Sequence, residues 1–369
     1  MRVALVYDRV NKWGGAERVL LALHELFPNA PLYTSVYNPG TAPWARVFDV
    51  RTSFLQNFPY APSTHELYAL LMPLAFESLN FDNYDVVISV TSEAAKGIIT
   101  KPGTFHLCYC LTPTRYLWSG YGAYFKEPIT KFFTKPIVSY LRKWDKIAAH
   151  RPDVMVAISE TVKERIKRYY GREVEVIYPP VGLDFRRKTL DVRDKNLNTK
   201  LQNLKSNNYF LIVSRLVPYK RVDLAIEAFN QLKLPLIIIG TGREEGKLKS
   251  MAGPTITFVG HLTDEELARY YEKATALIFP QEEDFGIVTV EAQRMGTPVI
   301  AYKSGGATET VIEGETGEFF EEQNADALAR VIQSFNKAKY KPEILKKHAQ
   351  KFSRERFKKE FLKILNRKS

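Results

Sequence analysis

The sequence predicts an α/β protein made of two Rossmann-like domains, each built on a doubly wound parallel sheet, that face each other across a cleft. Short runs of β-branched residues alternate with longer amphipathic segments along the chain, which is typical of repeated strand–helix units. Runs such as FLIVS and LIIIG are apolar throughout, as expected of strands that helices cover on both faces. The length of 369 residues suits two domains.

The individual elements are expected where these two patterns occur. Strands are predicted at Val3–Tyr7, Asp85–Val90, Phe105–Cys110, Val154–Ile158, Phe210–Ser214, Leu236–Gly240, Ile256–Val259, Ala276–Phe279, Val299–Tyr302 and Gly317–Phe320. Helices are predicted at Ala16–Phe27, Glu160–Tyr170, Val222–Gln231, Asp264–Ala274, Ile287–Met295, Asp326–Asn336 and Phe352–Arg367.

The domain boundary is expected near Tyr178, because the two prolines that follow it end the preceding strand. Residues 1–180 form the N-terminal Rossmann-like domain in this prediction, and residues 209–350 form the C-terminal one. Residues 181–208 are polar and are assigned to a linker or surface excursion. Residues 351–369 form a basic amphipathic helix, a candidate for packing back on the N-terminal domain.

Composition narrows the function classes. The net charge of +12 favours partners such as phosphates, nucleic acids or anionic lipids, and charge alone does not choose among them. No recognised nucleic-acid-binding module occurs, so a nucleic-acid binder is disfavoured. The first residues lack the pattern of a signal peptide, and no run approaches the ~20 apolar residues that span a bilayer. We expect a cytoplasmic protein, at most peripheral on the inner face of the membrane.

The two cysteines, Cys108 and Cys110, lie in the apolar run FHLCYC. Residues two apart in a strand share a face, and free cysteine is often buried. Two cysteines without matching partners do not make a tetrahedral metal site. We therefore expect two buried strand residues and no metal.

The segment Pro280–Gly306 carries the strongest chemical signal. Glu283 and Glu291 lie eight residues apart, with Gly286 at the predicted start of a helix. The free backbone N–H groups and the dipole of a helix start suit a diphosphate. A carboxylate accepts hydrogen bonds from the vicinal hydroxyls of a ribose or a sugar. The segment predicts a nucleotide-sugar site, and the alternative is an exposed loop before an ordinary amphipathic helix.

A second site element, SRLVPYKR, follows the strand FLIV. Arg215 and Lys220 are expected to converge at the carboxyl end of that strand. Cations placed there would stabilise the negative charge that builds on a leaving diphosphate. The alternative is a solvated basic turn.

Glycines mark two further turns. Gly240 and Gly242 close the strand LIII, where they would let the backbone approach a nucleotide. Gly14 and Gly15 follow the first strand and would bring backbone N–H groups near the donor phosphate and the acceptor. A tight turn that caps the next helix is the alternative for the second pair.

The chain resembles glycosyltransferase family 4 in these motifs. The family's Glu-x7-Glu motif, with FG between the carboxylates and an EA(x)xxGxPVIA tail, is matched at Glu283, Phe285, Gly286, Glu291, Ala292, Gly296, Pro298, Val299, Ile300 and Ala301. SRLVPYKR, GTGREEGKL, FVGHLTDEEL and GGAERV extend the resemblance over the whole chain.

This resemblance implies a GT-B fold, retention of anomeric configuration and no required metal or cofactor. It implies catalytic roles for Arg215, Lys220 and Glu283. It also implies a donor site that includes Phe285, Gly286, Ile287 and Glu291, together with Gly14, Gly15, Gly240 and Gly242. His261 stands in the family segment beside the base, with a structural histidine as an equal alternative.

One position departs from the family. Relatives usually read Y-x-H-T-P-x-R-Y-x-W, and this chain has Leu111 where the family's histidine contacts the transferred sugar. His106 is five residues away, an odd offset that puts it on the other face of a strand. Altered sugar preference, weakened catalysis and an introduced substitution are three open interpretations. Arg115 and Trp118 are candidates for sugar or acceptor contacts.

The overall pattern is most similar to bacterial mannosyltransferases of cell-surface polysaccharide assembly, on the YC-x-TP-x-RY-x-W segment and the VIYPPV linker. GDP-mannose is the favoured donor, with UDP-sugars open. The acceptor would be a glycan or a lipid-linked molecule. The aromatic and basic stretch Tyr121–His150 suits an anionic membrane surface, or else a packed helix with a solvated basic face. A nucleotide-sugar-binding protein with weakened or lost catalysis is the alternative function.

Overall fold

The computed structural model describes residues 1–124, 127–182 and 208–367. The chain forms two compact units, one comprising Met1–Pro180 with Arg354–Ser369 and the other Val181–Ser353. The division falls directly after the double proline of the sequence. Most of the predicted linker, residues 183–207, lies outside the described residues.

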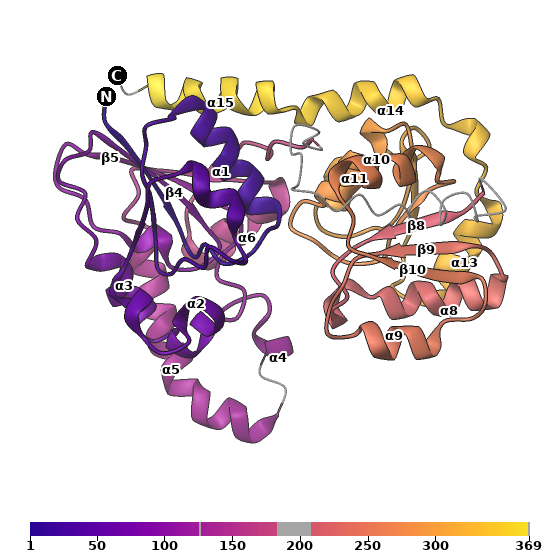
Figure 1. The fold of residues 1–369 in the computed structure, drawn as a ribbon, viewed down its shortest axis with the longest axis horizontal. Coiled ribbons are helices and arrows are strands. Elements are labelled where there is room, and N and C mark those ends of the chain that lie inside the picture. The colour runs from indigo at the N-terminus through magenta and orange to yellow at the C-terminus, as the bar shows by residue number, and fades with distance from the viewer. Residues whose placement is uncertain (125–126, 183–207, 368–369) are drawn as a thin grey trace. The chain divides into compact units, whose positions relative to one another are not determined.

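Unit 1 is a parallel sheet covered by helices (Figure 1), with the strand order β3-β2-β1-β4-β5-β6-β7. Its strands are β1 Val3–Tyr7, β2 Leu32–Thr34, β3 Val50–Thr52, β4 Val86–Thr91, β5 Phe105–Cys110, β6 Val154–Ala157 and β7 Glu175–Val176. Its α-helices are α1 Gly15–Leu26, α2 Ala61–Thr64, α3 Met72–Glu77, α4 Tyr121–Tyr124, α5 Pro128–Ala148, α6 Glu160–Tyr170 and α15 Arg354–Asn366. Its 3-10 helices are η1 Pro43–Val47, η2 Phe54–Asn57, η3 His65–Tyr68 and η4 Ala95–Gly97.

Unit 2 is a second parallel sheet, with the strand order β10-β9-β8-β11-β12-β13. Its strands are β8 Phe210–Val213, β9 Leu236–Ile239, β10 Ile256–Gly260, β11 Leu277–Phe279, β12 Val299–Tyr302 and β13 Gly317–Phe320. Its α-helices are α8 Val222–Leu232, α9 Glu245–Met251, α10 Asp264–Lys273, α11 Ile287–Arg294, α12 Ala307–Thr310, α13 Ala325–Ser334 and α14 Pro342–Ala349. Its 3-10 helices are η5 Pro218–Lys220, η6 Lys337–Lys339 and η7 Gln350–Phe352.

Local sequence accounts for where the helices begin and end. Thr263 and Glu266 form a capping box at the start of α10, each side chain accepting from the other residue's backbone N–H. The hydroxyl of Ser159 caps α6, which ends at Gly171 in the left-handed conformation, at φ 68°. The predicted helices are found with ends shifted by only a few residues.

The sheet of unit 2 is buried on both faces. Two apolar clusters cover it, one around Ile212, Phe229 and Ile238 and the other around Leu211, Tyr271 and Leu277. Consecutive strand residues therefore point into different cores, which explains why FLIV and LIII are apolar without alternation. Cys108 and Cys110 are buried in β5 as predicted, and burial raises the pKa of Cys108 to about 11.

The C-terminal helix α15 belongs to unit 1. The rings of Phe357 and Phe361 lie 5.6 and 6.3 Å from that of Tyr109 on β5. The Arg356 guanidinium donates to the Tyr178 carbonyl, 2.5 Å away. Arg354 of α15 pairs with Glu25, and Arg367, directly after the helix, pairs with Glu175. The two ends of the chain thus build one unit.

Candidate functional site

Two loops meet where the strand order of unit 2 changes direction. Strands β8 and β11 are neighbours, with Leu277 opposite Leu211. The chain leaves β8 through residues 214–221 and leaves β11 through residues 280–286. In parallel sheets, ligands bind beyond the carboxyl ends of the strands at such a switch point. The two motifs that the sequence singled out occupy these loops.

Lys220 and Glu283 bring the two loops together. Their side chains form an ion pair, and the exposed fractions are 12% and 19%. Both groups are largely withdrawn from water, so their interaction is less screened than that of a surface pair. The prediction that Lys220 and Glu283 share one site is consistent with this contact.

Arg215 lies in the same loop and is exposed. Its guanidinium donates to the hydroxyl of Tyr219, 2.6 Å away, and the Lys220 ammonium lies 5.2 Å from the centre of the Tyr219 ring. The two predicted cations therefore converge on Tyr219. Sequence reasoning missed this tyrosine, and its place between Arg215 and Lys220 in the motif is the signal that could have found it.

Gly286 sets the start of α11. Its φ of 87° is in the left-handed region that favours glycine, and as the N-cap residue it has no side chain with which to cap the helix. The helix ends at Arg294, followed by Gly296 at φ 83°. Glu283, the partner of Lys220, lies in the loop that leads to this helix start. Backbone N–H groups of a helix start and a cation are groups that hold phosphates.

Glu291 lies one turn inside α11 and is only 2% exposed. The hydroxyl of Tyr271, on α10, donates to its Oε2 at 3.1 Å. A buried carboxylate needs such a donor. Tyr271 therefore fixes the orientation of Glu291, the carboxylate that is predicted to bind the ribose. The sequence did not indicate this hydrogen bond.

The glycines after β9 allow close approach of the β8 loop. A Cβ atom at Gly240 would lie 1.9 Å from the Ser214 carbonyl oxygen, and one at Gly242 would lie 2.2 Å from the Leu216 carbonyl oxygen. Gly306 is equally tight, since its Cβ would lie 2.3 Å from the Cα of Phe285. These glycines let the loops of neighbouring strands pack at the edge of the sheet.

Three other residues that the sequence predicted near the donor are Phe285, Ile287 and His261. Phe285 is buried, and its ring packs 5.5 Å from that of Phe352, which supports a structural role for the side chain. Ile287 is the first residue of α11 and is half-buried. His261 is exposed after β10.

The predicted positions of unit 1 lie at the carboxyl edge of its sheet. Gly14 and Gly15 start α1, and a Cβ atom at Gly14 would lie 3.1 Å from a carboxylate oxygen of Glu17. Leu111 follows β5 and is half-buried, with its N–H donating to the Thr91 carbonyl at 2.7 Å. Arg115 is half-buried in the next turn.

Trp118 is engaged by its own unit. Its indole N–H donates to Asp145 at 2.7 Å, and its ring stacks on that of Tyr169 at 5.1 Å. The guanidinium of Arg142 lies 5.4 Å from the ring centre. These partners hold Trp118 in place, and the sugar or acceptor contact predicted for it stays a prediction.

His106 is buried in β5, and its Nε2 lies 2.8 Å from the Ser89 hydroxyl. Burial lowers its pKa to about 3 in the folded chain, from an ordinary value of 6.5. Between about pH 3 and pH 6.5, His106 is protonated in the unfolded chain and neutral in the folded chain. The free energy of unfolding therefore decreases as the pH falls below about 6.5. We expect His106→Gln to flatten the fall in melting temperature between pH 7 and pH 5.

The exposed His150 provides the control for this pH experiment. His150→Gln should leave the acid dependence as it is in the unchanged protein. If the melting temperature of His106→Gln depends on pH in the same way as that of the unchanged protein, buried His106 is not the source of the acid destabilisation.

Two parallel α/β units in one chain, together with the solved glycosyltransferase structures that the chain resembles, show the GT-B fold. The family described as "Glycosyltransferase Family 4" matches residues 13–185, and the family described as "Glycosyl transferases group 1" matches residues 194–352. The chain belongs to the GT4-type glycosyltransferases.

Solved structures agree on the fold. The sucrose-phosphate synthase of Thermosynechococcus elongatus superposes with a TM-score of 0.74 and 17% identity, over 100% of this chain and 99% of the other. Anabaena HepE in complex with UDP gives a TM-score of 0.71 and 20% identity, over 99% of this chain and 100% of the other.

Curated relatives are similar over a shorter stretch. A Corynebacterium glutamicum GDP-mannose-dependent monoacylated alpha-(1-6)-phosphatidylinositol monomannoside mannosyltransferase is 31% identical over 198 residues. A Mycolicibacterium smegmatis GDP-mannose-dependent alpha-(1-6)-phosphatidylinositol monomannoside mannosyltransferase is 28% identical over 198 residues. Each match covers 49% of this chain and 52% of the relative, so it spans about half of the relative's length.

Proposed function

We propose that this protein is a retaining glycosyltransferase that moves a hexose, with mannose from GDP-mannose favoured, onto a glycan or lipid-linked acceptor without a metal or other cofactor. The observation that carries the proposal is the pairing of Lys220 with Glu283 in the loop that leads to the start of α11. The mannosyltransferase relatives, which use GDP-mannose by name, support the choice of donor.

Donor binding follows from the loops of unit 2. The diphosphate would rest on the backbone N–H groups at the start of α11 and on Arg215 and Lys220. Lys220 would then exchange the Glu283 carboxylate for a phosphate oxygen, which leaves Glu283 beside the sugar. Glu291, held by Tyr271 on one oxygen, would accept from the ribose hydroxyls.

Transfer would depend on electrostatic stabilisation. Negative charge grows on the diphosphate as its bond to the sugar breaks, and cations fixed in advance lower the energy of that state. The acceptor hydroxyl would attack from the face that the diphosphate leaves, and a phosphate oxygen would take its proton. This route retains the anomeric configuration and needs no separate basic side chain.

The alternative is a protein that binds a nucleotide sugar and has weakened or lost catalysis. Leu111 motivates it, because its side chain offers no hydrogen bond where the family has a histidine. Titration calorimetry with GDP, UDP and ADP, followed by product analysis with the matching nucleotide sugars, separates the two. Binding of GDP with transfer supports the proposal, and binding without transfer or hydrolysis supports the alternative. Binding of none of the three would overturn both.

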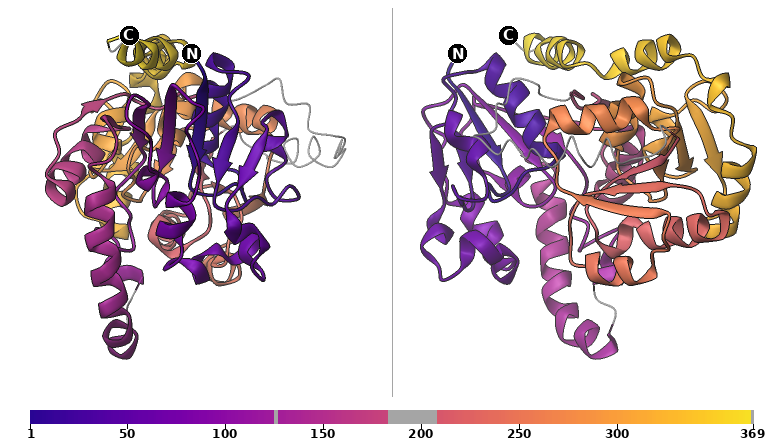
Figure 2. Two further views of the ribbon diagram at one scale, coloured as in Figure 1. Left: turned by 90° about the vertical axis from the view of Figure 1, so that its left-hand side faces the viewer. Right: turned by 45° about the vertical axis from the view of Figure 1, so that its right-hand side comes forward.

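Helix α5 is the proposed contact with an anionic membrane surface. Phe132, Phe133 and Tyr140 are exposed on it, and so are Lys135 and Lys143. Figures 1 and 2 agree that its amino-terminal end projects from the rest of unit 1. No helix in the described part of the chain has the length and apolar character that a bilayer span requires.

The membrane contact predicts flotation with vesicles that contain anionic lipid. Apolar rings and lysines together favour an anionic interface, and salt weakens the electrostatic part. Phe132→Ser with Phe133→Ser should reduce the floated fraction severalfold at low salt. Ile344→Ser, which removes an exposed apolar side chain of unit 2, should not. Flotation that is equal with neutral vesicles would contradict the prediction.

A further inference from the structure

Helix α11, whose start is proposed to bind the diphosphate, carries three buried polar side chains. Thr289 and Gln293 are fully buried and Glu291 is 2% exposed, although the helix has only eight residues. Thr289 and Gln293 are four residues apart and share one face of the helix, while Glu291 lies on the opposite face. Burial of a polar side chain costs free energy unless it is hydrogen-bonded, so each of the three needs a partner.

Thr310, the last residue of α12, is the partner of both side chains on the first face. It is fully buried, and its hydroxyl oxygen accepts from the hydroxyl of Thr289 at 2.8 Å. The amide nitrogen of Gln293 donates to its carbonyl oxygen at 2.6 Å. The Thr310 hydroxyl donates in turn to the Gly306 carbonyl at 3.0 Å. The hydroxyl of Thr289 also lies 2.6 Å from the carbonyl oxygen of Gly286, so these contacts reach the residue at which α11 begins.

His348, on α14, fixes the orientation of the Gln293 side chain. The amide nitrogen of Gln293 donates to Thr310, and its amide oxygen lies 2.7 Å from Nδ1 of His348 and accepts from it. Burial, followed by the positive charge of Lys351, lowers the pKa of His348 to about 4, so the ring is neutral at pH 7 and carries its proton on Nδ1. The side chain of Gln293 therefore joins α11 to both α12 and α14.

The loop that leads into α12 supports the Glu283 segment. The backbone N–H of Gly306 donates to the carbonyl oxygen of Glu283 at 2.8 Å. A Cβ atom at Gly305 would lie 2.4 Å from the same oxygen, so this close approach requires glycine. Helix α12 spans only four residues and therefore connects the segment that carries Glu283 with the residue that holds α11. A shift of Thr310 would move both predicted parts of the donor site.

We propose that Thr310 is a positioning residue for the donor diphosphate, because its hydrogen bonds with Thr289 and Gln293 set the place of the α11 start. The inference rests on the proposed function, since it concerns the diphosphate of that donor. A buried polar network whose members are all satisfied fixes one arrangement of the elements that it joins. A phosphate-binding helix start needs such an arrangement, because a hydrogen bond weakens steeply as its angle departs from linear.

The test measures, by titration calorimetry on the full chain, how much more tightly a nucleoside diphosphate binds than its monophosphate. GDP is compared with GMP, UDP with UMP and ADP with AMP, and the variants are measured with the pair that the unchanged protein binds. Thr310→Val removes the hydroxyl and keeps the shape of the side chain. It should lower the ratio of the two affinities roughly threefold to tenfold, which is the contribution of one hydrogen bond.

Two further variants of the network define the group that acts. Gln293→Met removes both ends of the amide and should lower the affinity ratio in the same direction as Thr310→Val. Thr310→Ser keeps the hydroxyl and should leave the ratio near that of the unchanged protein. If Thr310→Val does not fold, Gln293→Met provides the same comparison.

Thr316→Val is the matched control. Thr316 is a fully buried threonine of unit 2 outside α11 and α12, and its hydroxyl oxygen accepts from the N–H of Ile312 at 2.7 Å. Thr316→Val and Thr310→Val should both lower the melting temperature, because each loses a buried hydrogen bond. A loss of stability alone affects the two nucleotides equally, so Thr316→Val should leave the affinity ratio unchanged.

The outcomes separate this inference from the proposed function. If the unchanged protein binds a diphosphate and transfers the sugar, an affinity ratio in Thr310→Val equal to that in Thr316→Val would overturn the inference alone. An equal loss in Thr310→Ser would also overturn it, because the hydroxyl would then not be the group that acts. If the unchanged protein binds none of the three diphosphates, the proposed function fails, and the inference that rests on it fails too.

Discussion

Lys220→Ala is expected to lower turnover by about two to three orders of magnitude, because the loss of one preorganised group that stabilises transition-state charge costs roughly 3–4 kcal/mol. Arg215→Ala should act in the same direction. Steady-state kinetics with GDP-mannose and an acceptor would separate kcat from KM. The larger loss should fall on kcat, since the charge that these cations meet is greatest in the transition state.

The structure supplies a matched control for each cation. Tyr219→Phe removes the hydroxyl to which Arg215 donates and keeps the arginine. It should reduce turnover less than Arg215→Ala if Arg215 acts on the diphosphate directly. Lys249→Ala removes an exposed lysine of α9 and should leave turnover unchanged. Near-normal turnover in both Lys220→Ala and Arg215→Ala would refute the phosphate-binding role.

A merely structural role for Lys220 predicts a different pattern. Glu283 would then be the residue on which turnover depends, and Lys220→Ala would lower turnover because it frees the Glu283 side chain from its ion pair. In that case Lys220→Arg, which keeps a cation for Glu283, would restore turnover fully. If Lys220 acts on a phosphate as a compact point charge, the planar guanidinium would restore only part of it.

The sequence predicted all six strands of unit 2 and the strands β1, β4, β5 and β6 of unit 1, most of which are apolar runs. Strands β1, β5, β12 and β13 are found with the predicted bounds. Three strands of unit 1, β2, β3 and β7, were missed. Each has only two or three residues, and β7 and β3 lie at the two edges of the sheet. Runs of that length carry no periodic signal, so only tertiary pairing defines them.

The residues of the candidate site were likewise predictable from the sequence only in part. The motif residues of unit 2 lie in loops that a parallel sheet must bring to one edge, and the structure joins Lys220 with Glu283 there. Tyr219 and Tyr271 depend on side-chain direction, which spacing along the chain does not reveal. The hydrogen bond from Trp118 to Asp145 was not predicted for the same reason, since Asp145 is 27 residues away on α5.

Asp145→Ala is expected to destabilise unit 1 by about 3–5 kcal/mol, because it breaks a buried ion pair and leaves Lys96 without its counter-charge. Asp145 and Lys96 are each 1% exposed, and their charged atoms lie 2.6 Å apart. Burial alone would lower the pKa of Lys96, but the Asp145 carboxylate outweighs it and raises that pKa. The same carboxylate accepts from the hydroxyls of Thr114 and Tyr170, at 2.9 and 2.7 Å. All these donors would lose their acceptor together.

Thermal melting would measure the loss. In a unit of this size, 1 kcal/mol moves the transition by roughly 2–4 °C, so the expected fall is about 6–20 °C. Asp49→Ala, which removes one partner of an exposed ion pair with Arg51, should change the transition little. The double change Lys96→Met with Asp145→Leu should recover part of the loss, since it removes both buried charges. A transition equal to that of Asp49→Ala would show that the pair does not stabilise the unit.

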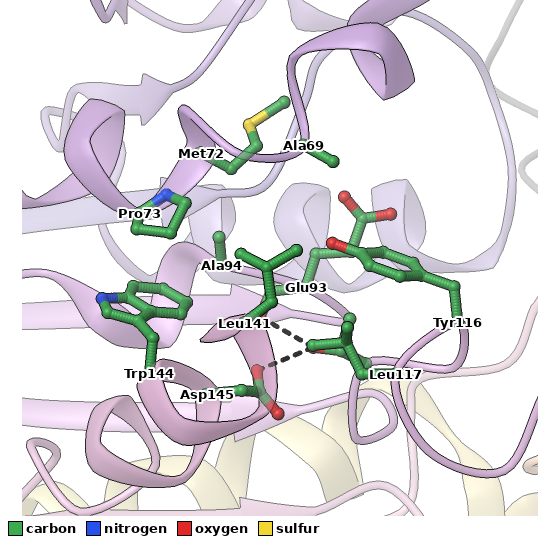
Figure 3. Close-up of a pocket in the computed structure, with 11 residues that line it drawn as sticks. Ala69, Met72, Pro73, Glu93, Ala94, Tyr116, Leu117, Leu141, Trp144 and Asp145 are labelled. Carbon is green, nitrogen blue, oxygen red and sulfur yellow. Dashed lines mark hydrogen bonds between the residues drawn. The ribbon is translucent and has the colours of Figure 1, made fainter. Parts of the chain in front are cut away.

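The same experiment bears on the acceptor side of the molecule. Asp145 holds Trp118 and Thr114, which flank Arg115, and it lies beside the small hollow between α3 and α5 that Figure 3 shows. Asp145→Asn keeps an acceptor oxygen but removes the charge. A fraction of this variant should therefore stay folded at temperatures below its lowered melting transition. In that folded fraction we expect a raised KM for the acceptor and unchanged GDP binding, because Asp145 lies in unit 1 and the predicted diphosphate ligands lie in unit 2. A parallel loss of GDP affinity would mean that Asp145 acts on the whole fold rather than on the acceptor segment.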